Sequence, residues 1–155
     1  MKKILIHPYS STMRNGKLNP KNYNKWDKVV ELLNSKNEYE LIQIGIDGDH
    51  KIKGINNFFF SKNMSELKDL LLSCYTWIDV DSFFQHMGYY YNKPGVVIFG
   101  VSDPNIFGYK KNINLLKDRK YLRKDQYMIW DNVEYNSEVF IDPEIVVNSI
   151  LNLKF

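Results

Sequence analysis

Short apolar runs alternate with segments of helical periodicity along the first two thirds of the chain. The apolar runs, which are typical of buried strands, cover residues 4–7, 39–45, 57–60, 76–80 and 96–99. The periodic segments predict helices over residues 64–74 and 81–91, and an earlier helix that begins at Pro20 with Asn19 as its cap. The chain therefore reads as strands and helices in regular alternation.

This alternation predicts the fold class. Strands that are joined through helices run parallel, so we expect a three-layer α/β, Rossmann-like domain with a mostly parallel sheet and right-handed crossovers. Ligands of such sheets bind at the carboxyl ends of the strands. The loops that start at His7, Gly45, Val80 and Gly100 are expected to converge there.

The pattern weakens after residue 104. Short strands are predicted near residues 112–115 and 127–130. Asp142-Pro143-Glu144 then opens a final helix that runs through Leu153, because it combines a capping residue, a proline suited to the first turn and an early acid. Since no repeat or linker divides the chain, we expect one domain over residues 1–155.

Composition and charge narrow the function classes. The formal net charge of +3 is too small to indicate nucleic-acid or membrane binding. The basic residues of segment 110–124 are interpreted as a solvated face, with a polyanion partner as the alternative. The single cysteine, Cys74, lies in an apolar run, and no apolar segment reaches the ~20 residues that span a bilayer. We expect a cytoplasmic protein without a membrane span, for which nucleic acid is not the expected partner.

Polar side chains at the start of the third predicted helix suggest a ligand site. Asp81 and Ser82 are predicted N-caps, and the same geometry directs the helix dipole and free N–H groups at a bound phosphate. His86, one turn inside this helix, faces either the core or that phosphate. Lys17 lies in a polar loop beyond the first strand, where an ammonium group can neutralise a diphosphate. These residues favour nucleotide chemistry, while plain caps and a solvated lysine remain the alternative.

At these residues the chain resembles a known family. It is similar to the carboxyl-terminal, nucleotide-sugar-binding domain of glycosyltransferase family 9, the heptosyltransferase-like enzymes of the GT-B fold, over residues 3 to about 109. Three differences stand out, because Asn19 replaces a Trp, Phe83 replaces the Gly of the family signature, and Val101 replaces a Pro. The fragments that carry the resemblance are Arg14-Asn15-Gly16-Lys17-Leu18-Asn19-Pro20, Gly45-Ile46-Asp47-Gly48-Asp49, Asp81-Ser82-Phe83-Phe84-Gln85-His86, Lys93-Pro94 and Phe99-Gly100-Val101-Ser102-Asp103-Pro104.

The resemblance implies a site for a nucleotide diphosphate sugar and transfer of its glycosyl group without a required metal ion or cofactor. Lys17 and His86 would take part in catalysis, and Asp49 would accept hydrogen bonds from the ribose hydroxyls. The Asp79-Val80-Asp81 sequence looks like the metal-binding motif of a different glycosyltransferase fold, but its context argues against that role. The full set of implied binding residues is Arg14, Lys17, Asp49, Asp81, Ser82 and His86.

The resemblance also implies that the acceptor site and the catalytic base come from outside the region of similarity. Family members carry an amino-terminal domain that supplies the acceptor site and the catalytic base, and this chain begins at the strand that opens their second domain. We therefore expect the acceptor site to come from a partner chain, a second copy of this chain, or the segment after Pro104. The alternative is a non-catalytic domain that senses or sequesters a nucleotide, which the missing glycine at Phe83 favours.

Overall fold

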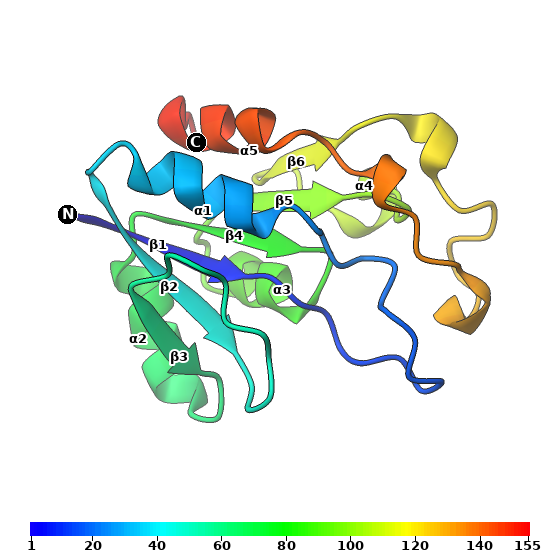
Figure 1. The fold of residues 1–155 in the computed structure, drawn as a ribbon, viewed down its shortest axis with the longest axis horizontal. Helices are drawn as coiled ribbons and strands as arrows, with labels where there is room; N and C mark the ends of the chain where they lie inside the picture. The colour runs from blue at the N-terminus through cyan, green and yellow to red at the C-terminus, as the bar shows by residue number, and fades with distance from the viewer.

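The computed structural model describes residues 1–155 and is organised around one six-stranded sheet. The strands are β1 (Lys2–His7), β2 (Tyr39–Gly45), β3 (Asn57–Phe60), β4 (Thr76–Val80), β5 (Val96–Phe99) and β6 (Ile113–Leu116). Their order across the sheet is β3-β2-β1-β4-β5-β6, and every neighbouring pair is parallel (Figure 1). The predicted Rossmann-like α/β class is confirmed.

Helices cover both faces of this sheet. They are α1 (Trp26–Asn34), α2 (Met64–Ser73), α3 (Phe83–Tyr90), α4 (Pro104–Phe107) and α5 (Pro143–Leu151). Helices α1 and α5 lie side by side on one face, and α2 and α3 lie on the other (Figure 1). None of the helices is both long enough and apolar enough to cross a membrane.

Alternation along the strands divides the apolar side chains between two cores. In β1, Ile4 and Ile6 join a cluster of 22 buried residues under α1 and α5, whereas Leu5 points to a cluster of 11 under α2 and α3. This period of two is the geometry of a strand that is buried on both faces. Both faces of the sheet are therefore covered by packed side chains, and the carboxyl ends of its strands position the loops that leave them.

The smaller core closes around a tryptophan. Trp77 of β4 is fully buried, and its indole N–H donates a hydrogen bond to the carbonyl of Lys93 at 2.9 Å. A Cβ atom on Gly95 would lie 2.2 Å from the indole ring, and one on Gly88 would lie 2.5 Å from it. Both glycines are therefore required by the close approach of the ring.

Two of the predicted elements are wrong. The first helix begins at Trp26 and not at Pro20, because the side chain of Asn19 accepts a hydrogen bond from the N–H of Lys21 and holds a turn there. Residues 127–130 form no strand. The side chain of Arg123 instead donates hydrogen bonds to the carbonyls of Met128 and Ile129, so this backbone wraps around a guanidinium group.

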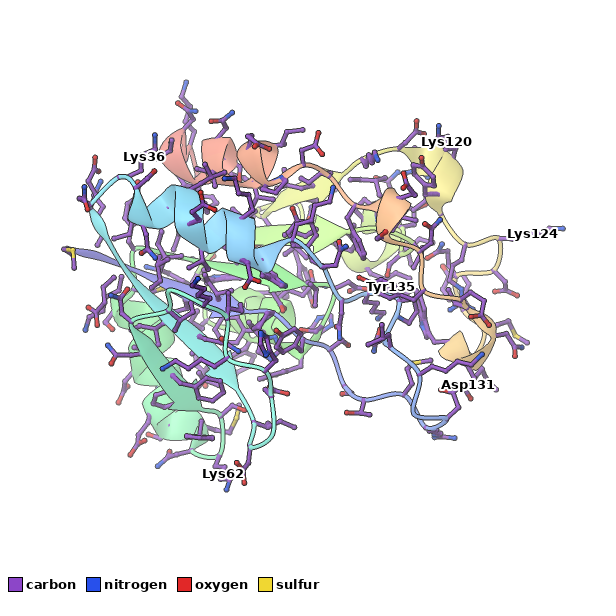
Figure 2. All side chains as sticks on the ribbon, viewed as in Figure 1. Lys36, Lys62, Lys120, Lys124, Asp131 and Tyr135 are labelled. Atoms are coloured by element: carbon purple, nitrogen blue, oxygen red, sulfur yellow. The ribbon has the colours of Figure 1, made fainter.

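The loop after β1 is attached to the C-terminal part of the chain. The amide of Asn15 donates to the carbonyl of Asp131 at 3.3 Å, and the hydroxyl of Tyr135 donates to the carbonyl of Asn22 at 2.8 Å. Figure 2 labels Asp131 and Tyr135 where the two segments meet, and it shows Lys124 pointing outward from the same end of the molecule. These contacts place a wall beside the carboxyl edge of the sheet.

Candidate functional site

A pocket opens at the carboxyl edge of the sheet. Its volume is about 160 Å³. Its lining residues come from the ends of β1 and β2, from the loops that follow them, from the position after β3 and from the start of α3. This is the place where the chain order reverses, since β2 and β3 lie on one side of β1 and β4 on the other. The lining residues are His7, Tyr9, Ser10, Ser11, Thr12, Gly45, Ile46, Asp49, Ser61, Ser82 and Phe83.

Most side chains that line the pocket carry hydroxyl groups. Such groups donate and accept hydrogen bonds, and they suit the hydroxyls of a sugar and the oxygens of a phosphate. Asp49 adds a carboxylate, His7 adds an imidazole, and no lysine or arginine lines the pocket. Six of the lining residues carry hydroxyls, namely Tyr9, Ser10, Ser11, Thr12, Ser61 and Ser82.

At the floor of the pocket, His7 and Ser82 share one buried carboxylate. Asp79 lies opposite His7 in the register of β4 and β1, and its Oδ1 lies 2.7 Å from Nδ1 of His7. Ser82 donates to the same Oδ1 at 2.7 Å and lies 3.0 Å from Nδ1 of His7. Because a carboxylate only accepts, this arrangement places a proton on Nδ1.

The same carboxylate closes the first turn of α3. Oδ2 of Asp79 accepts a hydrogen bond from the N–H of Gln85 at 2.9 Å. Ser82 occupies the N-cap position, but its side chain makes no capping hydrogen bond. The predicted N-cap position of Ser82 is confirmed, but capping by the side chains of Asp81 and Ser82 is wrong, because the carboxylate that accepts from the first turn comes from inside β4.

Asp81 lies beside the pocket and does not line it. This residue is buried, and its carboxylate accepts from the side-chain amide of Gln85 at 2.7 Å and pairs with the ammonium of Lys21 at 3.1 Å. Gln85 thus contacts both Asp79 and Asp81, through its backbone and its side chain. Asp81 therefore contacts the first turn of α3 through the side chain of Gln85.

Asp49 lines the pocket, as expected of the residue predicted to hold a ribose. Its Oδ2 accepts a hydrogen bond from the N–H of Ile46 at 2.9 Å, which holds the turn after β2. Tyr9 lies on the same wall. Burial, and to a smaller extent the charge of Asp49, raises the pKa of the Tyr9 phenol to about 12. The Tyr9 hydroxyl is therefore a neutral hydrogen-bonding group at physiological pH.

The remaining predicted residues lie outside the pocket. Lys17 forms an exposed ion pair with Glu134 at 2.9 Å, and Arg14 is exposed on the same loop. His86 is exposed on α3, where its Nδ1 lies 2.6 Å from the hydroxyl of Tyr109. Of the six residues in the predicted site, the structure brings Asp49 and Ser82 to the pocket and leaves Arg14, Lys17, Asp81 and His86 outside it.

Sequence reasoning missed the pair that anchors the pocket. His7 and Asp79 are separated by 72 positions along the chain, and no local motif joins them. A signal did exist, because Asp79 lies inside the apolar run of a buried strand, and a buried polar side chain requires a hydrogen-bonding partner. The adjacency of β1 and β4, however, becomes known only when the strand order is known.

No known protein-family model and no curated protein sequence matches the chain. Solved structures do match it in fold. E. coli ADP-heptose lps heptosyltransferase II is similar with a TM-score of 0.70 at 15% identity, over 97% of this chain and 45% of that one. The dodecameric iron-containing glycosyltransferase TibC of enterotoxigenic E. coli H10407 is similar with a TM-score of 0.61 at 20% identity, over 92% and 37%.

E. coli heptosyltransferase WaaC, solved with ADP, is similar with a TM-score of 0.56 at 13% identity, over 73% of this chain and 37% of that one. TibC has also been solved in complex with ADP-D-beta-D-heptose. The chain thus has the α/β fold of part of the heptosyltransferases, as the sequence resemblance predicted, and it spans less than half the length of each.

Proposed function

We propose that this chain binds a nucleotide diphosphate sugar in the pocket at the carboxyl edge of its sheet and serves as the donor-binding part of a glycosyltransferase. One observation carries the proposal: the fold matches heptosyltransferase II over 97% of the chain, and the pocket lies at the switch point where such sheets bind ligands. Among the similar structures, one was solved with ADP and one with an ADP-heptose.

The pocket residues suit the parts of such a ligand. Asp49, on the turn after β2, would accept hydrogen bonds from the ribose hydroxyls, and the serine and threonine hydroxyls would bind phosphate oxygens. The backbone N–H groups of Phe83 and Phe84 begin α3 and have no acceptor within the helix. They and the helix dipole would face the diphosphate.

The small volume of the pocket supports the proposal that this chain forms only part of the ligand-binding site. Its volume of about 160 Å³ is below the roughly 300 Å³ at which sites for drug-sized ligands begin. A nucleotide sugar would therefore be only partly enclosed by this chain. We propose that a partner chain or a second copy supplies the opposite wall and the acceptor site, in keeping with the chain spanning 45% of heptosyltransferase II.

Lys17, Arg14 and His86 retain their proposed roles only if the structure rearranges. Lys17 would leave Glu134 to neutralise the diphosphate and stabilise the departing nucleotide. His86 would have to give up its contact with Tyr109. We propose glycosyl transfer without a required metal ion. We also propose a cytoplasmic location, which the buried free thiol of Cys74 supports.

A binding and turnover assay tests the proposal. Calorimetry with ADP, UDP, GDP and their sugar conjugates should show binding of at least one nucleotide. Ser61→Ala and Asp49→Asn should weaken that binding about fivefold or more, since each removes one hydrogen bond to the ligand. Ser73→Ala and Asp69→Asn, which change exposed residues of α2, are matched controls and should bind as the native chain does.

Release of free nucleotide from a sugar donor separates the two functional classes. Release that Lys17→Ala abolishes would favour the transferase. Binding without release, with or without candidate partner chains, would favour a non-catalytic binder, for which Phe83 at the pocket wall is the supporting observation. Failure of every nucleotide and nucleotide sugar to bind would overturn the proposed function.

A further inference from the structure

We infer that His7 is the cation of this pocket: it binds an anionic ligand group through a protonated imidazole that Asp79 stabilises from behind, so that ligand binding takes up a proton. The inference rests on the proposed function, because it states how the proposed diphosphate is held. It assigns a binding role to a residue that neither the sequence motifs nor the family resemblance identified.

The pocket wall lacks a permanently charged cation. A diphosphate needs positive charge nearby, yet no lysine or arginine lines the pocket. The three lysines on the loop after β1 pair with carboxylates elsewhere: Lys17 with Glu134 at 2.9 Å, Lys21 with Asp81 at 3.1 Å and Lys25 with Asp142 at 3.4 Å. Arg14 is exposed on the same loop and does not line the pocket. Among the lining residues, His7 is the side chain that can carry a positive charge near neutral pH.

The imidazole of His7 is fixed by a buried carboxylate on one ring nitrogen. Asp79 is fully buried and engages Nδ1 at 2.7 Å, which leaves Nε2 as the ring nitrogen without a protein partner. Nε2 keeps some exposure to solvent, and His7 is one of the residues that line the pocket. The ring is held between Phe83, edge-on at 5.1 Å, and Phe84, stacked at 5.6 Å.

Two carboxylates lie near His7, one behind its ring and one on the pocket wall. Asp79 approaches from β4, Asp49 faces the pocket from the turn after β2, and Tyr9 on the loop after β1 is neutral. Helix α3 contributes only the uncharged rings of Phe83 and Phe84 and the hydroxyl of Ser82 at this position. A phosphate at Nε2 would add a further anion, so under this proposal the proton would be bound more tightly in the complex than in the free protein.

Proton uptake on ligand binding determines the direction in which ligand affinity changes with pH. If one proton is taken up with the ligand, the affinity falls by up to about tenfold per pH unit wherever the free imidazole is neutral and the bound one is charged. The affinity is then strongest on the acid side of neutrality. A ligand without phosphate, such as adenosine, gains nothing from the charge and should bind without proton uptake.

Calorimetry in buffers of different ionisation enthalpy measures how many protons the protein takes up when a ligand binds. We expect up to one proton per bound ADP and close to none per adenosine. His7→Gln places a neutral amide near Nε2, and it should abolish the uptake, flatten the pH dependence and weaken ADP binding about tenfold to a hundredfold. His50→Gln, at an exposed histidine outside the pocket, should retain all three properties.

A second measurement uses the native chain and requires no variant. Nitrogen NMR of the native chain resolves its three histidines, and the His7 ring should change from the neutral Nδ1–H form to the doubly protonated form when ADP is added at neutral pH. ADP binding with no proton uptake and an unchanged His7 ring would overturn this inference and leave the proposed function intact. Absence of nucleotide binding at any pH would overturn both.

Discussion

The carboxylate of Asp79 accepts a hydrogen bond from the backbone N–H of Gln85 at 2.9 Å, so a residue inside β4 caps the helix that follows it. The other oxygen of the same carboxylate contacts His7 and Ser82. Strand β1, strand β4 and helix α3 are therefore joined at one buried charge. Any change at Asp79 should affect both the stability of the fold and the shape of the pocket.

Asp79→Asn tests the first of these effects. The amide keeps the size of the side chain but replaces an accepting oxygen with a donor, which leaves His7 or the N–H of Gln85 without a partner. We expect a loss of about 2–4 kcal/mol in the free energy of unfolding, measured by urea denaturation. Asp69→Asn, at an exposed position on α2, is the control. Equal stability of the two variants would contradict the capping role.

Gly95→Ala tests the packing of Trp77. The new methyl group would lie 2.2 Å from the indole ring of a fully buried residue, so either the ring or the strand must move. We expect a loss of about 3 kcal/mol on thermal or urea unfolding, with a change in tryptophan fluorescence. Gly48→Ala has open space and should cost only about 1 kcal/mol, which reflects its positive φ of 90°. The reverse order of stability would contradict the structure.

The bidentate pair of Arg119 and Asp103 predicts an acid-sensitive contact. Hydrogen bonds from Arg119 at 3.0 and 2.7 Å lower the pKa of Asp103 below its usual range. A lowered pKa in the folded state contributes stability above the pKa of the unfolded chain, and this contribution is lost as the pH falls through the folded value. Arg119→Gln should therefore raise the pKa of Asp103 and reduce the loss of stability in acid.

NMR titration of the Asp103 carboxyl and urea unfolding between about pH 3 and pH 7 measure these two effects, over the range in which carboxylates titrate. Lys120→Gln removes a neighbouring exposed charge and should leave the Asp103 titration unchanged. A pKa of Asp103 that is the same with and without Arg119 would show that the pair does not persist in solution.

Glu134→Gln tests whether the ion pair with Lys17 restrains the loop after β1. Under the proposed function, freeing Lys17 lets its ammonium reach the diphosphate, so ADP affinity should rise about twofold to fivefold at low salt. Glu138→Gln, an exposed neighbour without an ion pair to Lys17, should change little. A fall in affinity would indicate that Glu134 helps to shape the site instead.

The thiol of Cys74 should be slow to react. Burial raises its pKa to about 11, so the reactive thiolate is scarce at neutral pH. We expect alkylation by iodoacetamide at pH 8 to be at least about a hundredfold slower in the folded chain than in urea, as followed by mass spectrometry. Equal rates would mean that the smaller core is open.

The strands and the parallel sheet could be predicted from the chain itself. Buried strands require continuous apolar runs, and helices between them require periodic apolar positions, so β1 to β5 and helices α2 and α5 followed directly. Helix α1 was expected too early, because Pro20 suits a helix start and nothing local shows that Asn19 holds a turn. Residues 127–130 have no strong local preference for a strand, and hydrogen bonds from the side chain of Arg123 to the carbonyls of Met128 and Ile129 hold their backbone in another conformation.

The sequence by itself determined the fold class, the edge of the sheet at which the pocket opens, and two residues that line this pocket, Asp49 and Ser82. These depend on local pattern and on the position of strand ends. Only the tertiary structure decided which side chains meet there. It joined His7 to Asp79 across 72 positions, paired Lys17 with Glu134, and turned His86 toward Tyr109. Such contacts depend on strand order and helix rotation, which are set by packing of the whole chain and by no segment alone.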